Sequence, residues 1–177
     1  MRTIVCIGDS LTYGYGVHAK DAWPYIVAKE TGITVINRGE NGDTTAEMLG
    51  RFYDDVILEE PEWVFLMGGT NDVMMGVSVD FVLENISLMI DKAKSAGIKT
   101  IIGIPPGIKN RAFKTFTDSL VRYCRSEDLY YVDFEHLYPV RMVLEGFGRL
   151  YSDDLHPTKE GHHVMAEIFC EFVKERC

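Results

Sequence analysis

The sequence predicts an α/β protein built on one doubly wound parallel sheet. Short apolar runs alternate five times with longer amphipathic segments, which is the order of repeated strand–helix–strand units. The apolar runs are nearly continuous, as strands that are covered on both faces require. No linker, internal repeat or low-complexity tract interrupts this pattern, so we expect residues 1–177 to form a single domain.

The five predicted strands are short, rich in β-branched and aromatic residues, and bounded by glycine, proline or polar residues. The first of them, RTIVCIG, runs directly into the segment DSLTYG. In chain order we expect the strands at Arg2–Gly8, Thr34–Asn37, Trp63–Met67, Thr100–Ile104 and Leu129–Asp133.

The predicted helices stop where glycine or proline would end them. Gly32 follows the first helix, Pro61 follows the second and Gly97 follows the third, which also has Ser78 as an N-terminal cap. In chain order we expect the helices at Ala22–Thr31, Thr44–Glu59, Ser78–Ala96, Ala112–Asp128 and Thr158–Lys174.

The charge balance narrows the range of partners. The chain carries 27 acidic against 18 basic residues, a net charge of −9, and no run of lysine or arginine. Nucleic acid is therefore not expected as a partner, because binding to its backbone depends on basic side chains that neutralise phosphates. No segment approaches the roughly 18 apolar residues of a membrane span, so we expect no membrane insertion.

The four cysteines show neither CxxC pairing nor a metal-ligand spacing. Unpaired thiols fit a reducing compartment, and nothing in the sequence resembles a secretory signal, so we expect a cytoplasmic protein. We expect neither a metal nor another cofactor. The sequence pattern specifies no oligomeric state.

Polar residues gather directly after the predicted strands and before the last helix. In parallel sheets, ligands bind beyond the carboxyl ends of the strands, so segments at these positions converge on one rim. The segments are Gly8–Gly14, Asn37–Thr44, Gly68–Asp72 and Asp153–Pro157.

Four blocks within these segments resemble the signature blocks of the SGNH (GDSL-type) hydrolases. They are GDSL at 8–11, the glycine of NGDT at 41–44, GTND at 69–72 and DxxH at 153–156, in the family's order. The resemblance implies a flavodoxin-like, three-layer α/β/α sandwich with a five-stranded parallel sheet. It also implies that Ser10, His156 and Asp153 form a catalytic triad, and that Ser10, Gly42 and Asn71 supply an oxyanion hole.

The chemistry of these residue types agrees with those roles. A serine hydroxyl becomes a good nucleophile only when a neighbouring base takes its proton, and imidazole suits that task near neutral pH. Asp153 and His156 are three residues apart and can meet in one turn, while Pro157 favours a loop before the helix. Asp154 is the rival for orienting the imidazole, but at two residues' separation it would face away.

The tetrahedral intermediate of acyl transfer needs hydrogen-bond donors aimed at its oxyanion. Gly42 permits a close backbone approach and Asn71 offers an uncharged amide donor, which would act with the backbone N–H of Ser10. Each residue also has an ordinary structural interpretation: Ser10 as a helix cap, and Gly42 and Asn71 as turn residues. Asp9 and Asp72 are interpreted as structural residues that bind backbone N–H groups.

A mixed group of aromatic and methionine residues lies near the predicted rim. Tyr13, Val73, Met74 and Met75 are candidates to line an acyl pocket, and Tyr15 and Trp23 lie in the same region. Ordinary core packing explains these side chains equally well.

We therefore expect a serine esterase that cleaves short acyl or acetyl esters, with a thioesterase or lysophospholipase as the alternative that uses the same triad. Two other classes of protein fit the sequence less well. Gly14–Ala19 matches a nucleotide-binding GxGxxA pattern but begins too far after the strand. Asp9, Asn71, Asp72 and His156 could gather around the divalent ion of a phosphoesterase, but a second ligand set is missing. A catalytically silent binding domain has no feature in its favour.

Overall fold

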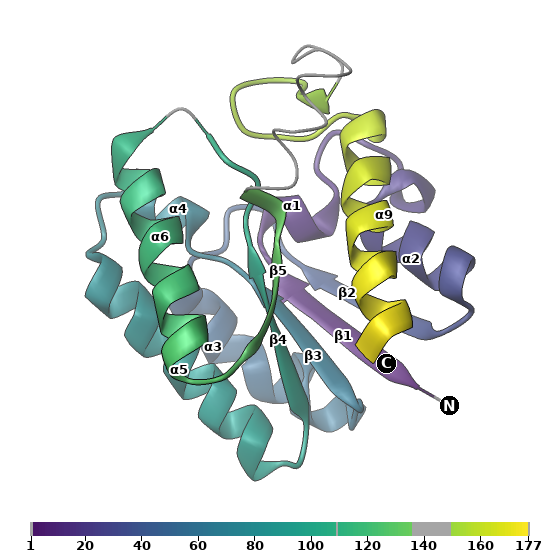
Figure 1. Cartoon of the computed structure of the whole chain (residues 1–177), viewed down its shortest axis with the longest axis horizontal. Helices are drawn as coiled ribbons and strands as arrows, with labels where there is room; N and C mark the ends of the chain where they lie inside the picture. The colour runs from purple at the N-terminus through teal and green to yellow at the C-terminus, as the bar shows by residue number, and fades with distance from the viewer. Residues whose placement is uncertain (1, 109, 136–149, 177) are drawn as a thin grey trace.

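The protein has a five-stranded, fully parallel sheet, seen in a computed structural model that describes residues 2–108, 110–135 and 150–176 (Figure 1). The strand order is β2-β1-β3-β4-β5, which is the flavodoxin-like order and confirms the predicted fold class. The strands are β1 (Thr3–Gly8), β2 (Thr34–Gly39), β3 (Trp63–Met67), β4 (Lys99–Ile104) and β5 (Tyr130–Asp133).

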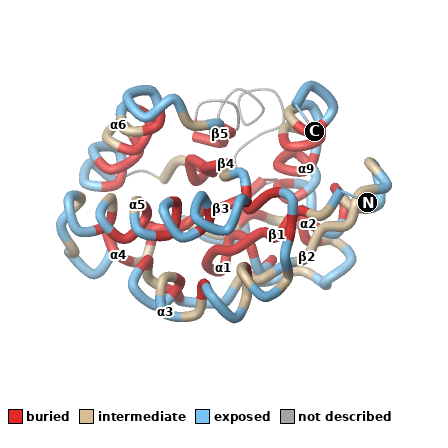
Figure 2. The backbone as a smooth tube through the Cα atoms, turned by 90° about the horizontal axis from the view of Figure 1, so that it is seen from below, coloured by how far each residue is buried: buried red, intermediate tan, exposed pale blue. Residues whose placement is uncertain are grey.

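Helices cover both faces of the sheet (Figures 1 and 2). The longer helices are α2 (Trp23–Thr31), α3 (Thr45–Asp55), α5 (Val79–Ser95), α6 (Arg111–Ser126) and α9 (Lys159–Arg176). Helices α2 and α9 share a core with one face, and α3, α5 and α6 share a core with the other. Shorter elements are α1 (Ser10–Tyr13) after β1, α4 (Thr70–Met74) after β3, and the 3₁₀ turns Ala19–Asp21 and Ile57–Glu59.

The two cores follow from the alternation of side chains along each strand. On β1, Ile4 and Cys6 face the α2 and α9 side, whereas Val5 and Ile7 face the α3, α5 and α6 side. Trp23 fills the first core: its ring centroid lies 5.1 Å from that of Phe65, in an edge-to-face contact. Because both faces are buried, the strands need continuous apolar runs, which is the feature the sequence displayed.

The ends of some elements differ from the prediction. Strand β2 continues to Gly39, and α3 stops at Asp55 and is followed by a separate 3₁₀ turn. Glu60 ends that turn with a left-handed backbone (φ 46°). Thr44 caps α3 instead of belonging to it, since its side chain and that of Glu47 form a reciprocal capping box.

The strand register brings the predicted site segments to one edge. Gly8, the last residue of β1, pairs with Gly39 of β2 and with Met67 of β3. The chain therefore leaves three neighbouring strands at the same level, at the end of the sheet where α1 lies in Figure 1. Within the described ranges, no helix is long and apolar enough to cross a membrane.

Candidate active site

Ser10 lies at the junction between strand β1 and a short helix. It is the first residue of α1, directly after β1, and only 7% of its surface is exposed. Asp9 caps this helix, with its Oδ1 accepting a hydrogen bond of 2.9 Å from the Leu11 N–H. As the first residue of this helix, Ser10 has a backbone N–H without a partner within the helix.

His156 and Asp153 meet Ser10 although they lie at the other end of the chain. Nε2 of His156 is 3.1 Å from Oγ of Ser10, and its Nδ1 is 2.8 Å from Oδ2 of Asp153. The other carboxylate oxygen, Oδ1, accepts hydrogen bonds from the Leu155 N–H (2.8 Å) and the His156 N–H (2.6 Å). Both Asp153 oxygens are thereby fixed, and the imidazole faces the serine.

The loop before α9 supports this arrangement. The Ser152 N–H donates to the His156 carbonyl over 2.8 Å, and Tyr151 forms an antiparallel bridge with Pro157. Partial burial opposes ionisation of Asp153, but the hydrogen bonds from His156 and Leu155 outweigh it and lower its pKa to about 2. The carboxylate of Asp153 is therefore charged at every pH well above about 2.

Tyr15, which the sequence predicts only to lie near the rim, contacts the His156 ring. Its ring centroid lies 4.6 Å from that of His156, with the planes tilted by 44°. Tyr15 follows α1 by two residues, so the same turn that presents Ser10 also restricts the imidazole on one side. No sequence spacing announces such a contact, because the partners are far apart in the chain.

The two other predicted donors are joined to each other through one turn. Gly42 adopts a left-handed backbone (φ 86°) that favours glycine, immediately before Asp43. Asn71, in the first turn of α4, donates from Nδ2 to the Asp43 carbonyl over 2.8 Å. The amide of Asn71 is therefore held beside the Gly42 turn, with its second N–H hydrogen still unused by that bond.

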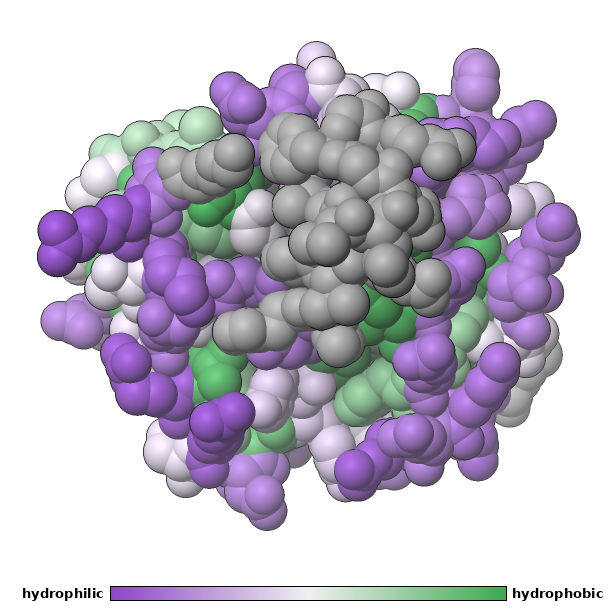
Figure 3. Space-filling view, turned by 45° about the horizontal axis from the view of Figure 1, so that its top comes forward, coloured by the Kyte–Doolittle hydropathy of each residue, from purple (hydrophilic) through white to green (hydrophobic). Residues whose placement is uncertain are grey.

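The candidate pocket residues divide into two groups. Tyr13, Met74 and Met75 are exposed by 51%, 59% and 69%. Val73 is buried and belongs to the core shared with α3, α5 and α6, so it packs inward instead of facing the rim. Figure 3 shows hydrophobic surface among mostly hydrophilic side chains at this end of the molecule.

Asp9 and Asp72 are both buried, as their structural interpretation predicts. Asp72 accepts from the Thr45 N–H (2.9 Å) and from the Thr45 hydroxyl (2.7 Å). Oδ2 of Asp9 has no hydrogen-bond donor among the described residues. Burial, reinforced by the nearby charges of Asp43 and Asp72, raises the pKa of Asp9 to about 7 against the opposing Leu11 hydrogen bond.

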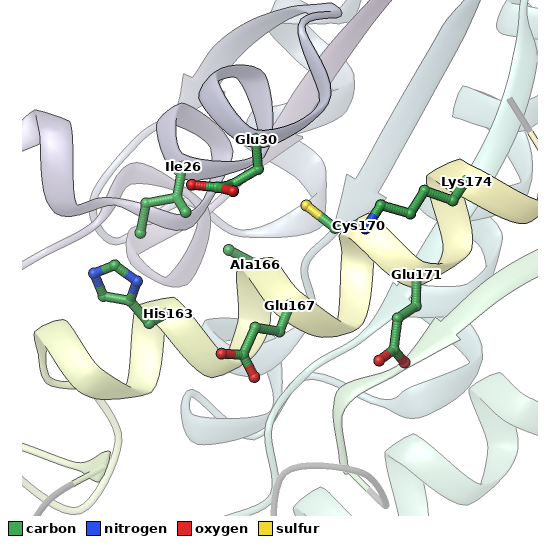
Figure 4. Close-up of a pocket in the computed structure, with 8 residues that line it drawn as sticks. All are labelled: Ile26, Glu30, His163, Ala166, Glu167, Cys170, Glu171 and Lys174. Atoms are coloured by element: carbon green, nitrogen blue, oxygen red, sulfur yellow. The ribbon is translucent and has the colours of Figure 1, made fainter.

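A hollow of about 390 Å³ lies away from these residues, between α2 and α9 (Figure 4). Its wall includes Glu30, Glu167, Glu171 and Lys174, and none of Ser10, Asp153 or His156 lines it. Across the described parts of the chain, no three His, Cys, Asp or Glu side chains lie close enough together to hold a metal ion.

At the carboxyl edge of the parallel sheet, a serine is hydrogen-bonded to a histidine, which is hydrogen-bonded to an aspartate. This arrangement is typical of hydrolases that act through an activated serine. The sequence profile of the GDSL-like lipase/acylhydrolase family matches residues 6–164. The chain belongs to this family and is a carboxylic-ester hydrolase.

Individual relatives agree with the assignment. The chain is 28% identical to an arylesterase of Vibrio mimicus, over 95% of this chain and 86% of that protein. It is 23% identical to thioesterase 1/protease 1/lysophospholipase L1 of Escherichia coli K12, over 93% of this chain and 80% of the relative. The crystal structure of the lipase/acylhydrolase from Enterococcus faecalis superimposes with a TM-score of 0.86 at 25% identity, covering 99% and 97% of the two chains.

Proposed function

We propose that the protein is a serine esterase for short acyl or acetyl esters, with Ser10 as nucleophile, His156 as general base and Asp153 as the residue that orients the imidazole. The observation that carries the proposal is the continuous contact from Oγ of Ser10 to Nε2 of His156, and from Nδ1 of His156 to Asp153. Within a GDSL-type fold, this contact is what turns an inert hydroxyl into a nucleophile.

The reaction proceeds in two halves. Oγ of Ser10 attacks the ester carbonyl while Nε2 of His156 takes the hydroxyl proton, and Asp153 stabilises the resulting imidazolium. The tetrahedral intermediate collapses to an acyl-serine as His156 returns the proton to the departing alcohol. Water, deprotonated by the same imidazole, then releases the carboxylic acid and restores Ser10.

The oxyanion of each intermediate requires donors on the far side of the carbonyl. We assign these to the N–H groups of Ser10 and Gly42 and to Nδ2 of Asn71. The position of Ser10 at a helix N-terminus supports the first, and the bond from Asn71 to the Asp43 carbonyl supports a shared site for the other two.

The preference for short acyl groups rests on the exposed residues at the rim. Tyr13, Met74 and Met75 offer apolar surface that is open to solvent, which suits a small acyl chain. A thioesterase or lysophospholipase is the second candidate, because the E. coli relative carries both of these names. Nitrophenyl esters of graded chain length, with acyl-CoA, a lysophospholipid and acetylated sugars, would separate these substrates.

Removal of the nucleophile tests the proposal. We expect Ser10→Ala to lower ester turnover by about 10⁴–10⁶-fold, because loss of a triad nucleophile leaves only the oxyanion hole and binding. The measurement is hydrolysis of nitrophenyl acetate and butyrate by the purified variant, with circular dichroism to verify folding. A serine-directed phosphonate should label Ser10 in the wild type, and turnover near the wild-type rate in Ser10→Ala would refute the mechanism.

The choice between the adjacent carboxylates tests the role of Asp153. We expect Asp153→Asn to reduce kcat by roughly 10²–10⁴-fold, because the amide cannot stabilise the imidazolium. Asp154→Asn is the matched control: Asp154 is exposed, and we expect its loss to change kcat by less than about twofold. Equal effects of the two substitutions would contradict the assignment.

We also propose a reducing compartment such as the cytoplasm as the site of action. Cys6, Cys124 and Cys170 are buried free thiols, which fits such a compartment. Cell fractionation of the producing organism, followed by detection with an antibody, tests this placement.

A further inference from the structure

Arg51 makes an unusual set of hydrogen bonds beneath the candidate site. It lies on α3 with 17% of its side chain exposed. Its Nε donates to Oδ2 of Asp43 over 2.7 Å, and its Nη2 donates to the Gly8 carbonyl over 3.0 Å. Its Nη1 donates to the Arg38 carbonyl (2.9 Å) and to Oδ2 of Asp55 (2.7 Å). One guanidinium thus contacts four separate acceptors.

Three of these acceptors belong to the segments that carry the proposed oxyanion donors: the carbonyls of Gly8 and Arg38, and the carboxylate of Asp43. The Gly8 carbonyl immediately precedes Asp9 and Ser10, so its position sets the start of the nucleophile turn. The same carbonyl accepts from the Glu40 N–H over 2.9 Å, and the Asp43 N–H reaches back to the Glu40 carbonyl over 3.4 Å. The turn that contains Gly42 is therefore fastened at its first residue to β1 and at its last to Arg51.

The third proposed donor joins the same network through the backbone. Asn71 donates to the Asp43 carbonyl, and the carboxylate of Asp43 is bound by Arg51. Ser10, Gly42 and Asn71 follow the ends of three different strands. One or two hydrogen bonds connect each of their segments to the guanidinium of Arg51.

Only arginine supplies this geometry. Its planar group carries five N–H donors with fixed directions, whereas lysine offers a compact ammonium that cannot span four acceptors. The Asp43 side chain is only 12% exposed, so its ion pair with Arg51 is shielded from solvent. The carboxylates of Asp43 and Asp55 balance the guanidinium, and the remaining donors are free to bind the two carbonyls.

We infer that Arg51 is a positioning residue for the oxyanion hole: it holds the Ser10 and Gly42 segments, and through Asp43 the amide of Asn71, in register for the transition state. The inference rests on the proposed function, because it assigns the oxyanion to these three donors. Arg51 does not touch the substrate, so its loss reduces kcat and leaves KM nearly unchanged.

The test compares Arg51→Lys and Arg51→Ala with the wild type, with each rate divided by the fraction of active serine titrated with a phosphonate ester. We expect kcat to fall by about 10-fold in Arg51→Lys and about 10²-fold in Arg51→Ala, with KM changing by less than about threefold. Because Arg51→Ala leaves Asp43 without its cation and endangers folding, Arg51→Lys, which keeps the charge, is the decisive variant. Millimolar methylguanidinium should partly restore kcat in Arg51→Ala, which a general loss of packing would not allow.

Arg38→Gln is the matched control. The Arg38 side chain forms ion pairs with Asp55 and Glu59, and among the described residues no hydrogen bond or ion pair joins it to the proposed donors; its backbone carbonyl, which Arg51 binds, is kept in the variant. We expect its kcat to stay within about twofold of the wild type. Wild-type kcat in Arg51→Lys, or a rise in KM alone, overturns the inference while an inactive Ser10→Ala still supports the esterase. An active Ser10→Ala overturns both.

Discussion

Asp9 and His162 are buried titratable residues whose pKa values are displaced so that both favour the neutral form. Burial, with the charges of Asp43 and Asp72, raises the pKa of Asp9 to about 7. Burial also lowers the pKa of His162 to about 4, and its Nδ1 accepts a hydrogen bond of 3.4 Å from the Trp23 N–H. Each residue therefore links folding to pH, with opposite signs.

The sign of each pH effect on stability depends on whether the folded or the unfolded state binds more protons. Asp9 stabilises the fold fully below the ordinary aspartate pKa, and this contribution is lost as pH rises towards about 7. His162 contributes fully above the ordinary histidine pKa, and its contribution is lost as pH falls towards about 4. Between these limits the two effects offset each other, so the wild type should show a flat stability profile.

Single substitutions should reveal the pH dependence of stability that each residue contributes. In Asp9→Asn, the free energy of unfolding should rise with pH between about 4 and 6.5, because only the His162 effect remains. In His162→Gln, which keeps an acceptor for Trp23, the free energy should fall with pH over the same range. The expected amplitude is on the order of 3 kcal/mol, measured by urea unfolding at a series of pH values. Parallel profiles for the wild type and both variants would contradict this explanation.

At the residue scale, short local motifs of the sequence were enough to identify the candidate catalytic side chains. Ser10 contacts His156, and His156 contacts Asp153, as the motifs led us to expect. The prediction that Val73 lines the acyl pocket was wrong, because its side chain packs in the core. Which side of a five-residue helix is buried depends on where the helix starts, and so short a segment has no periodicity that shows this. Arg51 was missed, although its position three residues after the buried Met48 places it on the inner face of an amphipathic helix.

At the element scale, the end of β2 packs against the turn that carries the nucleophile. A Cβ on Gly39 would lie 2.2 Å from the backbone nitrogen of Tyr13, so no side chain fits there. We expect Gly39→Ala to destabilise the protein by about 2–4 kcal/mol and to reduce kcat, because the α1 backbone must move. Thermal unfolding and ester hydrolysis measure the two effects.

Gly50 provides the matched control for Gly39. It lies within α3, and a Cβ there would meet nothing within 4 Å. We expect Gly50→Ala to stabilise the protein by about 0.5–1 kcal/mol without changing kcat, because alanine restricts the unfolded chain and favours helix. Similar losses of stability in both variants would show that the contact with α1 is not the cause.

The long elements were predictable because their signals are repeated over many residues. Each of the five predicted strands and five predicted helices has a counterpart in the described structure, although β2 ends later and α3 ends earlier than predicted. The short helices α1 and α4 span four and five residues, less than two turns, and leave no periodic signal. The end of α3 at Asp55 depends on the local backbone at Val56 and Glu60, which the propensities of the surrounding residues do not specify.

At the scale of the whole molecule, the net charge of −9 should influence which substrates approach the site. For a nitrophenyl ester with a sulfonate on its leaving group, we expect kcat/KM to rise about two- to tenfold as salt increases from about 10 mM to about 150 mM, because salt screens the repulsion. The unsubstituted ester should show no change. A fall in kcat/KM with salt for the sulfonated ester would indicate local attraction at the rim instead.

The alternation of strands and helices predicted a parallel sheet, but it could not predict the order of the strands. Neighbouring strands are chosen by long-range packing, and the placement of β2 outside β1 came only from the resemblance to a known family. The same limit applies to the site: local motifs identified its members, whereas the register of Gly8, Gly39 and Met67 decides that they converge.

The separation of Ser10 and His156 along the chain has a consequence for biosynthesis. The nucleophile precedes its base by 146 residues, and the base is followed by α9, which must pack against α2. A growing polypeptide therefore displays its serine long before it can use it. Hydrolysis of a chromogenic ester then begins only when α9 has been translated and has docked on α2, so the onset of turnover reports that the fold around the site is complete.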